Sequence, residues 1–211
     1  NTLRDILFGV YLYQSDSNVV ARNTVTGRPE LEQGGRGSGI HVWNSNHNVL
    51  EGNTISAARD GIYIQNANHT MIRDNEVFDL RYGLHYMFSD DNVFEDNTFE
   101  HAAAGSAIMY SNRIQFRRNR FLHNRGFASV GLLFKACDDV LAEDNLIADN
   151  ARGIFLEGSN RDVFRRNIIA ESDVAIVLYD SCANVRFEGN SFVANLSPLM
   201  LVGRRTDTVV A

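Results

Sequence analysis

Asparagine recurs in this chain at a nearly constant interval. Successive members of the series are 22, 30, 22, 22, 22, 26, 22 and 23 residues apart. A fixed period of this length indicates a solenoid, in which each repeat buries its apolar side only by stacking on its neighbours. The period therefore predicts which side chains are neighbours in space. The series consists of Asn1, Asn23, Asn53, Asn75, Asn97, Asn119, Asn145, Asn167 and Asn190.

Apolar residues and glycines recur in register with these asparagines. The positions two residues after and three residues before each asparagine are aliphatic or aromatic, as in Val77 and Phe94. Short runs of this kind, bounded by Gly, Asn, Asp and Ser, are typical of strands and turns. No stretch keeps an apolar period of 3.6 residues, so we expect few helices. Fourteen residues before most of the asparagines stands a glycine: Gly9, Gly39, Gly61, Gly83, Gly105, Gly131 and Gly153.

Two solenoid folds have a period of this length. A leucine-rich repeat needs leucines at fixed spacing around its asparagine, whereas here the flanking positions are β-branched or aromatic. We therefore predict an all-β fold, a single-stranded right-handed parallel β-helix with turns of about 22 residues, as one domain over residues 1–211. Stacked asparagines should hydrogen-bond along its axis. The chain starts on a ladder asparagine and stops within a repeat, without the caps that solenoids need, so we interpret it as a fragment cut mid-repeat at both ends.

Composition excludes several function classes. The chain has 211 residues, 44% hydrophobic content and a net charge of −6, which is typical of a globular domain. It contains no apolar run of about 18 residues and no signal peptide, so we expect no membrane insertion. Its Lys and Arg residues are scattered, which argues against a nucleic-acid partner.

Cys137 and Cys182 lie two turns apart, roughly 9–10 Å by strand spacing, so we expect free thiols with a packing role.

The strand after each of these glycines carries the residues of greatest chemical interest. Alternation along a strand places the first and third residues after the glycine inward, so the second and fourth point outward. We call the outward residues the outward stripe; they are mostly aromatic residues, histidines and methionines. Turn by turn the pairs are Tyr11 and Tyr13, His41 and Trp43, Tyr63 and Gln65, His85 and Met87, Ala107 and Met109, Leu133 and Lys135, and Phe155 and Glu157.

One part of the outward stripe forms a candidate metal site. Met87 and Met109 occupy equivalent places on adjacent turns, and His85 lies two residues before Met87. Two thioethers and an imidazole make a ligand set for Cu(I). His41, two turns from His85, is a candidate entry or alternative ligand. The same stripe could instead be a protein-binding patch, because exposed apolar surface and methionine both suit interfaces.

Two long repeats place their extra residues in the same corner of the turn. The insertions cover residues 26–37 and the region around residues 123–128. Because insertions on one side typically identify a binding face, we expect them to flank a groove whose floor is the outward stripe. The other histidines form two equivalent pairs, His47 with His69 and His101 with His123, which we interpret as solvated turn residues.

Several phrases of the sequence resemble the NosD family. The most specific is Leu80 to Ser89, which reads Leu-Arg-Tyr-Gly-Leu-His-Tyr-Met-Phe-Ser. The segments 39–44, 59–63 and 107–111 also resemble the family. The resemblance covers nearly the whole chain. It implies a periplasmic β-helix that delivers copper for nitrous oxide reductase maturation and performs no bond chemistry itself. It also implies three kinds of partner: membrane ABC-transporter subunits, a copper chaperone of the NosL type, and nitrous oxide reductase. It assigns a copper role to His85, Met87 and Met109.

Two other classes stay open. Many parallel β-helices are polysaccharide lyases, hydrolases or epimerases, whose chemistry needs paired carboxylates or a carboxylate with a base. The outward stripe offers Glu157 as its one acidic residue, so the best candidates for such an enzyme are at a strand edge: Asp60, Arg59, Arg81 and Tyr63. The other class is a metal-free structural or protein-binding repeat, because a fold does not by itself fix a function.

Overall fold

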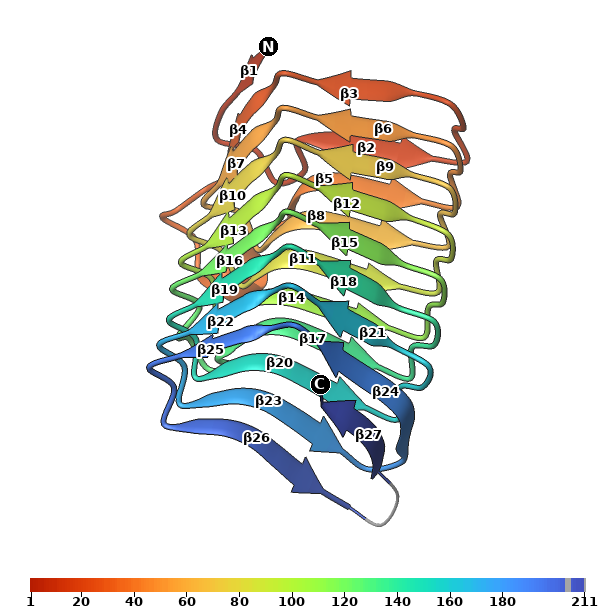
Figure 1. Ribbon diagram of the computed structural model, residues 1–211. Coiled ribbons are helices and arrows are strands. Elements are labelled where there is room, and N and C mark those ends of the chain that lie inside the picture. Colours follow the sequence, from red (N-terminus) through yellow and green to blue (C-terminus); the bar gives the residue numbers. More distant parts are fainter. Residues whose placement is uncertain (204–205, 211) are drawn as a thin grey trace.

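The chain winds into a parallel β-helix (Figure 1). The computed structural model describes residues 1–203 and 206–210. Each turn contributes one strand to each of three parallel sheets, and every sheet has nine strands. The predicted all-β solenoid is therefore confirmed. One short 3-10 helix, η1 (Gln33–Gly35), lies in the first insertion.

The three sheets follow one another around the turn. Sheet A comes directly after the ladder asparagines and consists of β1 (Thr2–Leu3), β4 (Thr24–Thr26), β7 (Thr54–Ser56), β10 (Glu76–Phe78), β13 (Thr98–Glu100), β16 (Arg120–Leu122), β19 (Leu146–Ala148), β22 (Ile168–Ala170) and β25 (Ser191–Val193). Sheet B carries the outward stripe and consists of β2 (Val10–Tyr13), β5 (Ser38–Trp43), β8 (Asp60–Gln65), β11 (Tyr82–Met87), β14 (Ala104–Met109), β17 (Val130–Lys135), β20 (Arg152–Glu157), β23 (Val174–Tyr179) and β26 (Ser197–Val202). Sheet C consists of β3 (Val19–Ala21), β6 (Val49–Glu51), β9 (Met71–Arg73), β12 (Val93–Glu95), β15 (Gln115–Arg117), β18 (Leu141–Glu143), β21 (Val163–Arg165), β24 (Cys182–Glu188) and β27 (Thr206–Val210).

The recurring asparagines form a continuous hydrogen-bonded ladder. From Asn1 to Asn190, each Nδ2 donates to the Oδ1 of the next asparagine at 2.9–3.1 Å. From Asn53 onward, each Oδ1 also accepts the backbone N–H of the preceding asparagine, as Oδ1 of Asn97 does from Asn75 at 3.0 Å. Buried amides need such partners, and this repeat provides them at every turn.

The interior is filled by the side chains that alternation places inward. Leu84 and Tyr86 on β11 are fully buried. Phe94 and Phe116 stack at 4.5 Å between ring centroids on successive turns of sheet C. A column glycine is required where neighbouring turns approach closely, since a Cβ on Gly83 would lie 2.6 Å from the carbonyl oxygen of Gly105. The core thus fixes which residues of sheet B face outward.

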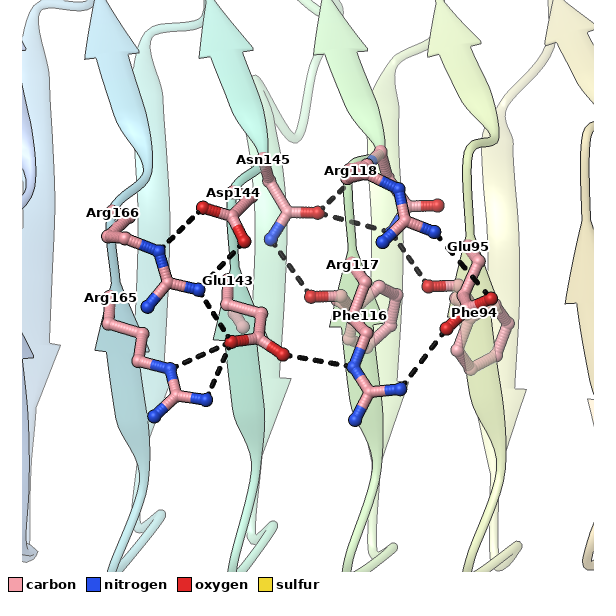
Figure 2. A network of polar contacts seen from close by, with 12 residues as sticks. Phe94, Glu95, Phe116, Arg117, Arg118, Glu143, Asp144, Asn145, Arg165 and Arg166 are labelled. Carbon is pink, nitrogen blue, oxygen red and sulfur yellow. Dashed lines mark hydrogen bonds and ion pairs between the residues drawn. The ribbon is translucent and has the colours of Figure 1, made fainter.

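Sheet C has a charged outer surface, in contrast to sheet B. Figure 2 shows ion pairs that run from turn to turn across this face. Arg117 donates to Glu95 at 3.2 Å and to Glu143 at 3.0 Å, and Arg165 donates to the other oxygen of Glu143 at 2.7 Å. Glu143 is buried beneath its arginine partners, so these ion pairs satisfy its charge and keep this side of the rod polar.

Both cysteines are free and buried, as predicted. Burial raises the pKa of the Cys137 thiol to about 12.

The described residues include no helix that is long and apolar enough to span a membrane.

Candidate functional site

The pairing of two neighbouring strands of sheet B, β11 and β14, places three of the four predicted metal ligands side by side. Between β11 and β14, Met87 is the register partner of Met109, and His85 is the partner of Ala107. Both methionines and His85 are half-buried on the outer face. The two thioethers therefore come from adjacent turns, with the imidazole two residues before one of them and a small side chain facing that imidazole on the next turn.

A tyrosine hydroxyl lies beside one of the thioethers. Tyr63 is the register partner of His85 on the preceding turn. Its hydroxyl oxygen lies 2.8 Å from Oε1 of Gln65 and 3.9 Å from Sδ of Met87. Because Gln65 is the stronger acceptor, the Met87 sulfur keeps a free lone pair, which a soft metal ion can use.

A buried carboxylate contacts His85, and the sequence reasoning did not foresee this contact. Asp60, the first residue of β8, is fully buried. Nε and Nη2 of Arg81 donate to its two oxygens at 2.8 and 2.7 Å, and Nδ1 of His85 lies 3.2 Å from Oδ2. Nε of Arg59 lies 3.5 Å from the same oxygen. Burial alone would raise the pKa of Asp60, but the hydrogen bonds from His85 and Arg81 outweigh it and hold this pKa below its usual value.

The sequence did contain a signal for this contact. Asp60 is the one carboxylate among the residues that precede the column glycines from Gly39 to Gly153. A single acidic residue in an otherwise uncharged or basic column indicates a specific partner, since buried charges are paired. The partners lie 21 and 25 residues away, in other columns.

His41 is separated from the other three predicted ligands. The rings of Tyr11, His41, Tyr63 and His85 follow one another at centroid distances of 4.5, 4.4 and 4.7 Å. The ring of Tyr63 thus lies between the two imidazoles. Burial, together with the positive charge of Arg59, lowers the pKa of His41 to about 4, so its imidazole is neutral at pH 7. The structure brings Met87, Met109 and His85 together but not His41.

Exposed aromatic side chains continue along the same side of the rod. Phe88 and Tyr110, which directly follow β11 and β14, stack at 5.1 Å between ring centroids. Tyr13 and Trp43 lie 5.1 Å apart at the N-terminal end of the stripe. All four are exposed, and such an apolar surface is typical of interaction sites.

The two insertions meet at a cavity that lies beside the outward stripe rather than over it. The cavity has a volume of about 450 Å³, and Gln33 of the first insertion and Phe127 of the second insertion both line it. His101 and His123 also line it, with their rings stacked at 5.1 Å. No residue of the outward stripe lines this cavity, so the cavity is not the groove that we expected over the stripe.

In the described part of the chain, no group of three or more His, Cys, Asp and Glu side chains is arranged to hold a metal ion.

These features define a class of protein: a parallel β-helix whose outer face carries thioether and imidazole groups. A scan against protein families matches residues 22–209 to "Periplasmic copper-binding protein (NosD)". The chain belongs to the NosD family, which is described as periplasmic. A search of curated proteins gives no match.

Solved structures with the same architecture include carbohydrate-active enzymes. An alginate lyase from Paenibacillus sp. is 15% identical, with all of this chain and 91% of that chain covered and a TM-score of 0.64. The A-module of the mannuronan C-5 epimerase AlgE6 from Azotobacter vinelandii is 13% identical, with 100% and 76% covered and a TM-score of 0.63. A tailspike protein of bacteriophage CBA120 is 11% identical, with 99% and 36% covered and a TM-score of 0.71. At these identities the likeness concerns the fold alone.

Proposed function

We propose that this protein binds Cu(I) at Met87, Met109 and His85 and passes it between proteins in the periplasm. The pairing of Met87 with Met109 on the outer face of sheet B, next to His85, carries the proposal. Thioethers favour Cu(I) over hard cations, and imidazole also suits copper. The family description as a copper-binding protein supports the same cargo.

The geometry favours an exchangeable site over a storage site. The two thioethers carry no charge, and the imidazole has a neutral form. All three side chains lie half-buried on an open face. Delivery requires an ion to leave as well as to bind. His41 would act as an entry ligand, from which an ion moves past Tyr63 to His85. We expect no bond-making chemistry in this role.

The partners follow from the resemblance and from the surface of the rod. We propose that a NosL-type copper chaperone and nitrous oxide reductase contact the outward stripe in turn, and that ABC-transporter subunits hold the complex at the membrane. The exposed aromatic residues Tyr13, Trp43, Phe88 and Tyr110 offer an apolar contact surface beside the ligands.

A competition titration tests the copper proposal. The reduced protein is titrated with Cu(I) against a competing chelator, as wild type and as Met87→Ala with Met109→Ala. We expect the double variant to lose at least about tenfold in affinity, which corresponds to about 1.4 kcal/mol. Met200→Ala is the matched control, because Met200 is an exposed methionine on β26 of the same sheet. Unchanged affinity in the double variant would exclude the proposed ligands.

The buried Asp60 favours a second candidate, a uronic-acid-modifying enzyme. A carboxylate-backed histidine with Tyr63 beside it and two arginines nearby could abstract a proton next to a sugar carboxylate. Two of the structural neighbours are an alginate lyase and a mannuronan C-5 epimerase. Incubation with alginate, followed by absorbance of unsaturated products and by NMR for epimerisation, tests this candidate. Product formation that is lost in His85→Gln would favour it over copper transfer.

A further inference from the structure

We infer that Asp60 is the positioning residue of the copper site. Its carboxylate holds the Nδ1 proton of His85 and leaves Nε2 as the ring nitrogen that can bind the metal. This inference rests on the proposed function, and it assigns a role to a residue that contributes no ligand itself.

The hydrogen bonds to Asp60 determine which ring nitrogen of His85 carries the proton. An ionised carboxylate only accepts hydrogen bonds, so Nδ1 at 3.2 Å from Oδ2 must be the donor. The bidentate pair with Arg81, at 2.8 and 2.7 Å, favours the ionised form of Asp60. A neutral imidazole carries one proton. With that proton on Nδ1, the lone pair is on Nε2.

Aromatic contacts restrict the orientation of the same imidazole. Tyr63 packs edge-on against His85 at 4.7 Å and 87°, and Tyr82 does so at 5.2 Å and 69°. The guanidinium of Arg81 lies 4.5 Å from the centre of the Tyr82 ring, so the residue that pairs with Asp60 also fixes this tyrosine. A histidine held on several sides loses little freedom when it binds a metal ion, and carboxylates behind metal-binding histidines act in this way.

This arrangement separates two kinds of ligand. His85 is oriented before binding, and its side chain is only 14% exposed. Met87 and Met109 have flexible, unbranched side chains that can adjust around an ion. One fixed nitrogen and two adaptable sulfurs allow an ion to bind without requiring the whole site to be rigid.

The tautomer of His85 in the metal-free wild-type protein tests the inference directly. Long-range ¹H–¹⁵N spectra at about pH 8, above the ordinary histidine pKa of ~6.5, show which nitrogen carries the proton, and His85→Gln assigns the signal. We expect the Nδ1–H tautomer. The Nε2–H tautomer would overturn the inference. Because copper is absent, the result does not depend on the proposed function.

A second measurement tests whether Asp60 affects metal binding. In Asp60→Asn, an amide N–H replaces a carboxylate oxygen beside the donors of Arg81 and His85. Nδ1 of His85 is then no longer required to donate, so we expect the population of the Nε2–H tautomer to rise and the Cu(I) affinity to fall about 10- to 100-fold. Asp91→Asn is the matched control, since it removes the bidentate partner of Arg113 on an exposed corner. Unchanged copper affinity in folded Asp60→Asn would contradict the role. If Asp60→Asn does not fold, the tautomer of His85 in the wild-type protein still tests the inference. If wild type binds no Cu(I) but shows Nδ1–H, the copper proposal fails and the positioning of His85 by Asp60 stands.

Discussion

The asparagine ladder keeps the turns in register, and its removal at one position should be costly. Asn97 is fully buried in the middle of the rod. Its Nδ2 donates to Asn119 and to the carbonyl oxygen of Ile72, both at 2.9 Å. Its Oδ1 accepts the backbone N–H of Asn75 at 3.0 Å and the Nδ2 of Asn75 at 2.9 Å. Asn97→Ala removes these four hydrogen bonds together.

The size of the effect follows from the groups that lose a partner. A net value of about 1 kcal/mol per hydrogen bond predicts a loss of about 4 kcal/mol in the free energy of unfolding. Two of the partners keep another hydrogen bond: the Asn75 amide still reaches the carbonyl oxygen of Leu50, and Asn119 still accepts the backbone N–H at position 97. These residual bonds reduce the loss, whereas the backbone N–H of Asn75, left without its side-chain acceptor, increases it, so about 4 kcal/mol is a central value. Since domains are stable by only about 5–15 kcal/mol, the loss should be easy to measure.

Urea unfolding followed by circular dichroism measures this loss as a shift of the midpoint. Asn1→Ala is the control, because Asn1 is exposed and its side chain makes one ladder bond, to Asn23 at 3.0 Å. We expect the control to lose less than about 1 kcal/mol. A loss in Asn97→Ala no greater than that of the control would refute the argument that the ladder stabilises the turns.

Three further predictions concern Asp162, the two cysteines and His41. Asp162 is buried with Oδ2 unpartnered, and burial raises its pKa to about 8, so its contribution to stability is present below about pH 4 and is lost as the pH rises toward 8. Asp162→Asn should therefore be more stable than wild type by more than about 1 kcal/mol at pH 8, and an equal or lower melting temperature there would contradict this. Cys137 and Cys182 have raised thiol pKa values through burial, so a thiol reagent should label them only after denaturation, and rapid labelling of the native protein would show that they are accessible. Because Tyr63 separates His41 from His85, we expect His41→Ala to change the equilibrium Cu(I) affinity by less than about twofold while it slows loading from a copper donor, and a tenfold loss of affinity (about 1.4 kcal/mol) would make His41 a direct ligand.

The fold could be predicted from the sequence because a parallel solenoid converts sequence separation into spatial neighbourhood. Met87 and Met109 differ by one period, and the structure makes them register partners. The same arithmetic places Tyr63 between His41 and His85. Strand alternation then decides which residues face outward, as the buried Leu84 shows. These inferences need no knowledge of side-chain conformation.

The contacts of Asp60 could not be obtained in this way. Asp60, Arg81 and His85 occupy three different columns, so the period does not pair them. Their contacts depend on the direction of long side chains at a corner where strand alternation no longer applies. The cavity under the insertions was missed for a similar reason. Gln33 and Phe127 come from loops whose residues repeat nowhere else, so no column predicts their positions.

The charges around the proposed ligands favour a monovalent, soft ion that can leave again. Arg81 and Asp60 form a bidentate pair that cancels most of their charge, and Arg59 adds a positive charge 3.5 Å from the same carboxylate. The local balance is therefore positive, and it repels a cation. Repulsion grows with the charge of the ion, so a divalent ion is disfavoured more strongly than Cu(I). In the proposed site, affinity would then come from coordination by sulfur and imidazole, for which Cu(I) is well suited, and the electrostatic opposition would favour release of the ion.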